Sequence, residues 1–417
     1  MAIDIDNSGK FEPSDCIAVI GQGYVGLSLA MSALSADVRV IGIDTSFQLV
    51  ERLNNGISHI EGVPSKILES ALKDRRYIAT SDFSKVATCE TVIIAVPTPI
   101  HSNHKPDLTM LEQACDSIAP HLSPNTLIIS ESTSYIGTLR NVVAKRILNL
   151  TKLSIEFAVS PERVDPGNLL FQVRNTPRIV GGLTQSSTQR AVNLYGKFCE
   201  NVVAVSSAEV AEAAKLLENT FRYINIAFIN EFSQLMNTMS IPALEVIDAA
   251  STKPFGFSRF EPSAGVGGHC IAVDPFYLQK NANEIEQPLK FIELSREFND
   301  QMSRYLVSQL ETKYGRIKDK SVLVVGLSYK PNVADTRESA SWKVIDELRA
   351  RGAKVSWHDP VVKAHEDSIS TRLSDAFDLS LVLVNHDILD FSDWGDAPIF
   401  CINKSENRPT WIPLIGT

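Results

Sequence analysis

The sequence lacks the features that mark several classes of protein. No run approaches the roughly 18 consecutive apolar residues of a membrane-spanning helix, so we expect no membrane span. Lysine and arginine total 40 against 49 aspartate and glutamate residues, a net charge of −9, which excludes a broad basic surface for nucleic acid. The polar, acidic residues 1–14 lack the two regions of a secretory signal peptide, and we expect them to form a disordered N-terminal lead.

Cysteine is also scarce. The chain has 6 cysteines among 417 residues, and they are far apart and without CxxC spacing. This pattern fits a reduced, cytoplasmic protein without structural zinc, and we expect no metal site.

The sequence does contain an alternation of apolar runs and helical patterns. Its composition, 44% hydrophobic and 21% charged, is ordinary for a globular protein, and at ~150 residues per domain its length suggests about three domains. Short apolar runs predict buried parallel strands at 16–20, 38–43, 91–96 and 126–130. A second group of such runs lies at 321–325, 354–357, 380–384 and 398–402. Strands that alternate with helices predict α/β domains with doubly wound parallel sheets.

One long helical pattern separates the two α/β regions. Residues 208–239 contain no glycine or proline, and apolar residues recur there at helical spacing. A helix of about 30 residues, at a rise of 1.5 Å per residue, is about 45 Å long. We therefore expect two Rossmann-like doubly wound parallel-sheet domains joined by a long central helix, which is also a candidate dimer face.

A glycine-rich motif follows the first predicted strand. The sequence GQGYVG at 21–26 precedes an Ala/Leu-rich helix, and Asp44 ends the next strand 18 residues later. In a dinucleotide site Gly21 permits the tight turn, Gly23 lets the pyrophosphate approach the backbone, and Gly26 permits close packing of helix on strand. Asp44 can accept a hydrogen bond from a ribose 2′-hydroxyl and would repel a 2′-phosphate, so NAD is favoured over NADP. A mononucleotide site or a purely structural glycine turn is the alternative.

A second glycine-rich segment, 263–275, surrounds Cys270. Its three glycines would let the backbone approach a bulky ligand closely. A thiol in such a polar loop can act as a thiolate nucleophile, and Asp274 can take part in proton transfer. The alternative is that Cys270 is a small buried hydrophobic residue. For the adjacent His269 we expect a structural role.

Polar residues on the long helix and after two strands are further candidates. Lys215 and Asn219 are spaced i,i+4 and share one face of the helix. With Glu212 nearby, the alternative is a solvated charged face. Thr98 and Thr133 follow predicted strands, where a helix cap or a turn is the alternative.

Together these motifs resemble the nucleotide-sugar 6-dehydrogenase family, whose members oxidise UDP-glucose, UDP-N-acetylhexosamines or GDP-mannose. The resemblance covers nearly the whole chain, from about residue 16 to about residue 359. The matching segments are GQGYVG at 21–26, VPTP at 96–99, EST at 131–133, SPERVDPGN at 160–168, AKLLENTFRYINIAFINE at 214–231, GVGGHCIAVDPFYL at 265–278 and GLSYKPNVADTRES at 326–339.

The resemblance implies a role for each matching position. The implied catalytic residues are the nucleophile Cys270, the polar cluster Lys215, Asn219 and Asp274, Thr133 beside the reacting centre, and Glu162, which helps release the acid product. The implied NAD contacts are Gly21, Gly23, Tyr24, Val25, Gly26, Asp44, Thr98, Thr133 and Arg337. The implied sugar-nucleotide contacts are Glu162, Arg163, Lys215, Asn219, Arg259, Phe260, Ser263, Gly267 and Lys330.

The implied reaction is a four-electron oxidation of the sugar C6 alcohol to a carboxylate. Cys270 captures the intermediate aldehyde as a thiohemiacetal, a second hydride transfer to NAD leaves a thioester, and water releases the acid. The segments SPERVDPGN at 160–168 and STKPFGF at 251–257 resemble the N-acetylhexosamine branch of the family. UDP-N-acetylglucosamine is therefore favoured over UDP-N-acetylmannosamine, and both are favoured over UDP-glucose.

The resemblance also implies an organisation and a biological role. Residues 15–206 would form the NAD-binding domain, 207–312 a central helical dimerisation domain with the cysteine segment, and 313–417 a sugar-nucleotide-binding domain. A homodimer through the central helix would supply precursors for surface polysaccharides. The alternatives are a two-electron NAD dehydrogenase and a non-enzymatic nucleotide-binding protein. The NADH formed per sugar distinguishes the three, at two, one and none respectively.

Overall fold

The computed structural model describes residues 16–60, 63–101, 105–165, 167–168, 170–373, 376–392, 394, 396–404, 408 and 410–415. The expected disordered lead at 1–14 lies outside the described residues. The chain divides into two compact units, Met1–Leu217 and Glu218–Thr417. Within the described part, no helix combines the length and apolar character that crossing a membrane requires.

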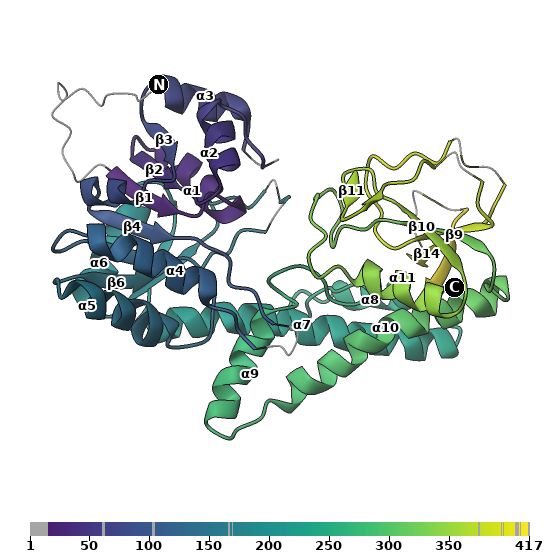
Figure 1. The fold of residues 1–417 in the computed structure, drawn as a ribbon. Coiled ribbons are helices and arrows are strands. Elements are labelled where there is room, and N and C mark those ends of the chain that lie inside the picture. Colours follow the sequence, from purple (N-terminus) through teal and green to yellow (C-terminus); the bar gives the residue numbers. More distant parts are fainter. Residues whose placement is uncertain are drawn as a thin grey trace. The chain divides into compact units, whose positions relative to one another are not determined.

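The first unit is built on an eight-stranded sheet, seen in purple to teal in Figure 1. Its strands are β1 (Cys16–Ile20), β2 (Arg39–Ile43), β3 (Tyr77–Thr80), β4 (Thr91–Ile94), β5 (Leu127–Ser130), β6 (Glu156–Val159), β7 (Arg178–Gly182) and β8 (Val202–Ala204). The order is β3-β2-β1-β4-β5-β6-β7-β8, so the first six have the 3-2-1-4-5-6 order of a Rossmann fold. These six are parallel, but β7 runs antiparallel to β6. The predicted parallel sheet is therefore followed by one reversal.

Strand β1 shows why the predicted strands are continuous apolar runs. Ile17 and Val19 belong to the core on one face of the sheet, and Ala18 and Ile20 belong to the core on the other. The first core includes residues of α1 (Tyr24–Leu34), α2 (Phe47–Asn54), α3 (Ser65–Lys73) and α6 (Gln185–Tyr195). The second includes residues of α4 (Thr109–Ile118) and α5 (Lys145–Thr151). Since helices cover both faces, the sheet is doubly wound as predicted.

The predicted long helix is present as α7 (Ala208–Thr238), with 31 residues. It runs without interruption across the division between the two units. At 1.5 Å per residue it is about 46 Å long.

After α7, the described residues of the second unit contain four α-helices and a parallel five-stranded sheet. The helices after α7 are α8 (Ala243–Ser251), α9 (Asp274–Glu284), α10 (Lys290–Tyr314) and α11 (Ala340–Ala350). The sheet strands are β9 (Ser321–Val325), β10 (Lys354–His358), β13 (Leu379–Val382), β14 (Ile399–Asn403) and β15 (Ile412–Ile415), and a small hairpin joins β11 (Ala364–His365) to β12 (Ser368–Ile369). The sheet order is β10-β9-β13-β14-β15, which is the flavodoxin-like variant of the Rossmann arrangement.

The two faces of this second sheet are covered differently. Helices α10 and α11 pack on one face, where Leu306 and Leu348 belong to the core. On the other face, Phe377, Phe391 and Trp394 lie outside the helices and strands and pack against a second core. Aromatic loop residues thus take the place of a second helical layer.

Candidate active site

The glycine-rich loop between β1 and α1 has the predicted geometry. Gly21 has a φ of 89°, and a Cβ there would lie 2.7 Å from the carbonyl oxygen of Ala95. A Cβ on Gly26 would overlap the carbonyl oxygen of Gly21. Both positions therefore require glycine for the chain's own packing.

Gly23 is different, and this difference indicates a ligand. A Cβ on Gly23 would meet no heavy atom of the described residues within 4 Å, apart from its neighbours in the chain. Its φ of −69° is also open to any residue. Internal packing therefore does not explain this glycine, whereas close approach of a pyrophosphate to the start of α1 does. The loop thus fits a dinucleotide.

Asp44 is fixed beside this loop at the end of β2. Its Oδ2 accepts a hydrogen bond of 2.8 Å from Gln22 N, and its Oδ1 accepts one of 2.9 Å from Ser46 N. The Gln22 side chain is buried beneath the loop, where Tyr77 Oη donates to its Oε1 at 2.8 Å. Gln22 and Tyr77 therefore support the loop from below. The sequence motif leaves position 22 unspecified, so neither residue was predicted.

The loops after β4 and β5 are tied together. Thr98 Oγ1 donates to the carbonyl oxygen of Thr133 at 2.5 Å, and Ser132 Oγ donates to the carbonyl oxygen of Val96 at 2.7 Å. The structure thus brings together two residues predicted to contact NAD, at the carboxyl ends of adjacent strands.

Glu162, which follows β6, is held from both sides. Its Oε1 accepts from the backbone N–H groups of Arg163 (2.6 Å) and Val164 (2.7 Å), and its Oε2 pairs with Arg178 at 2.9 Å. Burial raises the pKa of Glu162, but the charges of Arg178 and Lys215 and the two N–H donors outweigh it and hold the pKa below its usual value. Lys215 and Glu162, both predicted catalytic residues, are therefore close enough to interact.

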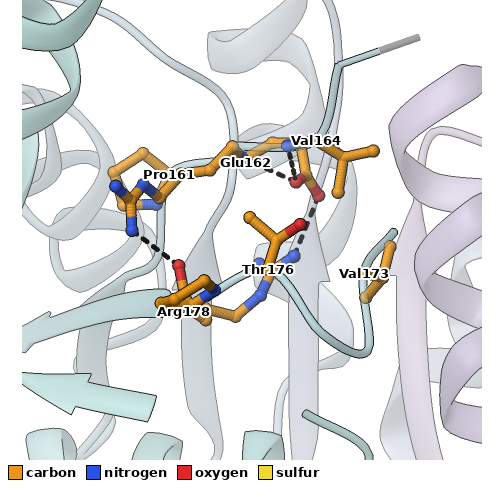
Figure 2. Close-up of a pocket in the computed structure, with 8 residues that line it drawn as sticks. Pro161, Glu162, Val164, Val173, Thr176 and Arg178 are labelled. Atoms are coloured by element: carbon orange, nitrogen blue, oxygen red, sulfur yellow. Dashed lines mark hydrogen bonds and ion pairs between the residues drawn. The ribbon is translucent and has the colours of Figure 1, made fainter. Parts of the chain in front are cut away.

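Figure 2 shows the small pocket around this glutamate, lined by residues 161–164, 173 and 176–178. Arg178 points to the Glu162 carboxylate from across the pocket. The Arg163 guanidinium donates to the carbonyl oxygen of Pro177 at 2.6 Å. The predicted substrate contact Arg163 thus braces the loop that carries Glu162.

The face of α7 that carries Lys215 and Asn219 is buried. Glu212, Lys215 and Asn219 have exposed fractions of 7%, 9% and 6%, so the alternative of a solvated charged face is wrong. Glu212 accepts hydrogen bonds from Gly137 N (2.6 Å) and Leu139 N (2.9 Å). Burial raises its pKa to about 7.

In the second unit, Cys270 lies in a turn directly before α9. Its carbonyl oxygen accepts from Asp274 N at 2.8 Å, and its side chain is partly exposed. Asp274 is itself buried, and its Oδ2 accepts from Asn219 Nδ2 at 2.5 Å. The structure therefore brings Asn219 and Asp274 together, and it disfavours the alternative that Cys270 is a buried hydrophobic residue.

Arg337 is close enough to the Cys270 thiol for an electrostatic interaction. A hydrogen bond from its guanidinium to Asp335 and the charge of a Cys270 thiolate both raise the pKa of Arg337 above its usual value. His269 Nδ1 is 3.6 Å from Asp335 Oδ2, which is too long for a hydrogen bond. The described residues contain no group of three or more His, Cys, Asp or Glu side chains that could hold a metal.

The glycines before Cys270 have another explanation than the predicted one. A Cβ on Gly267 would lie 3.0 Å from the Glu338 carbonyl oxygen, and a Cβ on Gly268 would lie 3.0 Å from the Tyr329 ring. Gly268 also has a φ of 86°. The chain's own packing therefore requires these glycines, so they give no independent evidence for a ligand.

Comparison with known proteins decides the family. The models of the NAD binding, central and UDP binding domains of the UDP-glucose/GDP-mannose dehydrogenase family match residues 15–199, 209–301 and 323–399. The chain belongs to this family. It is an NAD-dependent UDP-sugar dehydrogenase, which confirms the predicted family, enzyme class and cofactor.

The most similar relatives carry names from the N-acetylhexosamine branch. The chain is 35% identical over 349 residues to UDP-N-acetyl-D-mannosamine dehydrogenase of Campylobacter jejuni, covering 81% of this chain and 84% of that protein. It is 34% identical over 357 residues to NDP-N-acetyl-D-galactosaminuronic acid dehydrogenase of Ralstonia nicotianae, covering 83% and 81%. The solved structure of UDP-D-ManNAc dehydrogenase from Pyrococcus horikoshii matches with a TM-score of 0.84 and 30% identity, over 93% and 94% of the two chains.

Several residues predicted to contact the sugar nucleotide form interactions with other residues of the dehydrogenase itself. Arg259 pairs with Asp248 at 2.9 Å and with Glu261. Phe260 packs edge-on against Phe221, with ring centroids 6.0 Å apart. Ser263 N donates to the Asn230 side chain at 2.9 Å. A phosphate on Arg259 would therefore compete with two carboxylates.

The dehydrogenase also has a buried polar cluster that sequence reasoning missed. Asp359, which follows β10, accepts hydrogen bonds of 2.7–3.0 Å from the N–H groups of Leu327, Ser328, Val361 and Val362. Burial raises the pKa of Asp359, but a hydrogen bond from His386 and the N–H groups of Ser328, Val362 and Val361 outweigh it and hold the pKa well below the usual value.

His386 completes this cluster. Its Nδ1 accepts from Asn332 N at 3.0 Å, so the proton is on Nε2, which lies 3.3 Å from Asp359 Oδ2. The predicted substrate contact Lys330 lies in the 327–332 loop, which Asp359 and His386 anchor at its two ends.

Proposed function

We propose that this dehydrogenase oxidises the C6 alcohol of a UDP-N-acetylhexosamine to the uronate, with Cys270 as a covalent nucleophile. The sequence motifs favoured UDP-N-acetylglucosamine, but several relatives are named UDP-N-acetyl-D-mannosamine dehydrogenase, so UDP-N-acetylmannosamine now comes first. UDP-glucose remains third.

The observation that carries this proposal is the surroundings of Cys270. Cys270 is partly exposed, as is Cys16 in strand β1, whereas Cys89, Cys115, Cys199 and Cys401 are buried. Cys270 lies four residues before the buried Asp274, whose N–H donates to the Cys270 carbonyl oxygen, and it is close enough to Arg337 to interact with the guanidinium charge. A nearby cation stabilises a thiolate, which is the nucleophilic form.

The chain's own residues supply the remaining chemistry. When bound, NAD supplies the acceptor for each of the two hydrides. In the first oxidation, a water held by Lys215 and Asp274 takes the hydroxyl proton. The Cys270 thiolate then adds to the aldehyde carbon, and the aldehyde oxygen takes a proton to become a hydroxyl. The second hydride can then leave that carbon while the new hydroxyl loses its proton, which leaves the thioester. Lys215 stabilises the developing oxyanions, and water hydrolyses the resulting thioester.

A homodimer through α7 is part of the proposal. Six large apolar side chains of α7 and its end are 43–66% exposed and recur at intervals of seven and four residues, which places them on one stripe. They are Val210, Leu217, Phe221, Phe228, Leu235 and Met239. A second copy of this helix would cover such a stripe.

We further propose that the uronate serves surface polysaccharide synthesis and is made in the cytoplasm, where the six cysteines, all thiols here, stay reduced.

Stoichiometry tests the proposed function. The enzyme is offered NAD with UDP-N-acetylmannosamine, UDP-N-acetylglucosamine or UDP-glucose, and NADH is counted per sugar consumed. We expect two NADH per sugar and the highest kcat/KM for an N-acetylhexosamine. One NADH per sugar would favour a two-electron dehydrogenase, and preferred turnover of UDP-glucose would refute the branch assignment.

Cys270→Ser should still bind the UDP-sugar but form no carboxylate, and normal carboxylate production by that variant would refute the covalent step.

A further inference from the structure

The reversed strand β7 brings a buried cation to the carboxyl ends of β5 and β6. Gly181 of β7 lies opposite Val159, the last residue of β6, so the earlier residues of β7 extend past the end of β6. Arg178, the first residue of β7, therefore lies beside the segments that follow β5 and β6. Only 3% of its side chain is exposed.

Arg178 joins two carboxylates from different strand ends. Its Nη1 is 2.7 Å from Glu131 Oε1, after β5, and its Nη2 is 2.9 Å from Glu162 Oε2, after β6. The ring of Tyr195 lies under the guanidinium at 4.7 Å, and Tyr195 Oη donates to Glu131 at 2.5 Å. A planar fork of donors holds two carboxylates in fixed directions, whereas the rotatable donors of an ammonium do not.

The two carboxylates are not equivalent. The side chain of Glu131 is 0% exposed and that of Glu162 is 13% exposed, so Glu162 alone can reach a ligand. Burial raises the pKa of Glu131 to about 7, whereas the pKa of Glu162 is held low. The buried Glu131 carboxylate therefore holds the Arg178 guanidinium in place, and the guanidinium in turn holds the Glu162 carboxylate.

We propose that Arg178 is a positioning residue that holds the Glu162 side chain in the orientation needed for hydrolysis of the Cys270 thioester. This inference rests on the proposed function. In that step water adds to the thioester carbonyl, the carbon–sulfur bond breaks, the sulfur leaves as a thiolate, and the proton lost by the water passes to Glu162. Because one Oε of Glu162 is held by backbone N–H groups and the other by Arg178, loss of the guanidinium releases one of two anchors.

Arg178→Lys and Glu162→Gln test this role, with Arg174→Met as the control. Arg174 belongs to an exposed ion pair with Glu200, so its loss should change kcat less than about twofold. With each test variant we expect a rapid burst of two NADH per active site, then a steady rate about 100-fold below that of the wild type. The Kd for NAD, measured by calorimetry on the free enzyme, should not change. A burst that shrinks in proportion to the rate would overturn the assignment, because an earlier step would then be slow.

A double-mutant cycle shows whether Arg178 acts through Glu162. Arg178→Lys combined with Glu162→Gln should be no slower than Glu162→Gln alone, and additive losses in kcat would overturn the proposal. Arg178→Met serves as a second variant and should give the same burst if it folds. A wild-type enzyme that forms no NADH with any UDP-sugar would refute the proposed function instead. The coupling between the two residues would then be measured in urea unfolding, where its absence overturns the positioning role.

Discussion

Alanine at position 23 should weaken NAD binding without harming the fold. A Cβ on Gly23 meets no heavy atom of the described residues within 4 Å, and the φ of −69° suits alanine. Gly23 is the N-cap of α1, so the cost in stability should be below about 1 kcal/mol. The methyl group would stand where a pyrophosphate approaches the backbone. Loss of one hydrogen bond to a charged group costs about 1.5–3 kcal/mol, or about 10- to 100-fold in affinity.

The same substitution at Gly21 should have the opposite effect. Its φ of 89° is a strained conformation for alanine, at about 1–2 kcal/mol. Its Cβ would lie 2.7 Å from the carbonyl oxygen of Ala95, which adds about 1–3 kcal/mol of overpacking. Gly21→Ala should therefore destabilise the first unit by about 2–5 kcal/mol.

Urea unfolding and NAD titration by calorimetry separate the two effects. We expect Gly23→Ala to unfold at nearly the wild-type urea concentration but to bind NAD at least tenfold more weakly. Gly21→Ala should unfold at a clearly lower urea concentration. If Gly23→Ala bound NAD with wild-type affinity, the pyrophosphate would not approach this residue, and the explanation for the glycine would be refuted.

Three further predictions concern buried charge and the helix surface. Because burial raises the pKa of Glu212 to about 7 from an ordinary 4.5, its contribution to stability is present below pH 4.5 and is lost as pH rises through 7. Glu212→Gln should therefore gain up to about 3 kcal/mol relative to wild type between those pH values in urea unfolding, and parallel pH profiles would contradict this. Asp359→Asn should destabilise the second unit by about 3–5 kcal/mol and weaken UDP binding by calorimetry, since it disturbs the loop that carries Lys330; unchanged UDP affinity would show that this loop does not bind UDP. Phe228→Glu should convert a dimer to a monomer in light scattering, and a persistent dimer would exclude this face.

Local sequence patterns predicted the central strands of both sheets and the long helix. Strands β1 and β9 coincide with the predicted runs 16–20 and 321–325, and α7 ends one residue before its predicted end. Such elements are apolar on both faces or have a long uninterrupted helical period, so they depend little on distant partners. The strands that were not predicted are short, and their apolar runs are brief or contain glycine or proline: β3, β6, β7, β8, β15 and the hairpin strands β11 and β12.

The candidate site was predicted where motifs are local and missed where pairing is distant. The glycine loop, Asp44 and the i,i+4 pair Lys215 and Asn219 each depend on spacing within one or two elements. Arg178 reaches Glu162 only because β7 is reversed, and strand direction leaves no mark in a short apolar run. Asp359 follows β10 and His386 follows β13. These two strands flank β9, so both residues lie at the carboxyl end of β9, and this strand order is set by the assembly of the whole sheet.

The glycines of the two motifs show how far a composition argument extends. Both segments are equally rich in glycine, and from sequence alone both suggested close approach of a ligand. In the structure, Gly21, Gly26, Gly267 and Gly268 are each crowded by the chain itself, and only Gly23 of these five faces open space. A glycine motif is therefore evidence for a ligand only at the positions that folding does not already require. By that criterion the first motif indicates a dinucleotide through Gly23 alone. The case for Cys270 depends instead on its exposure, on Arg337 and on the buried pair of Asn219 and Asp274.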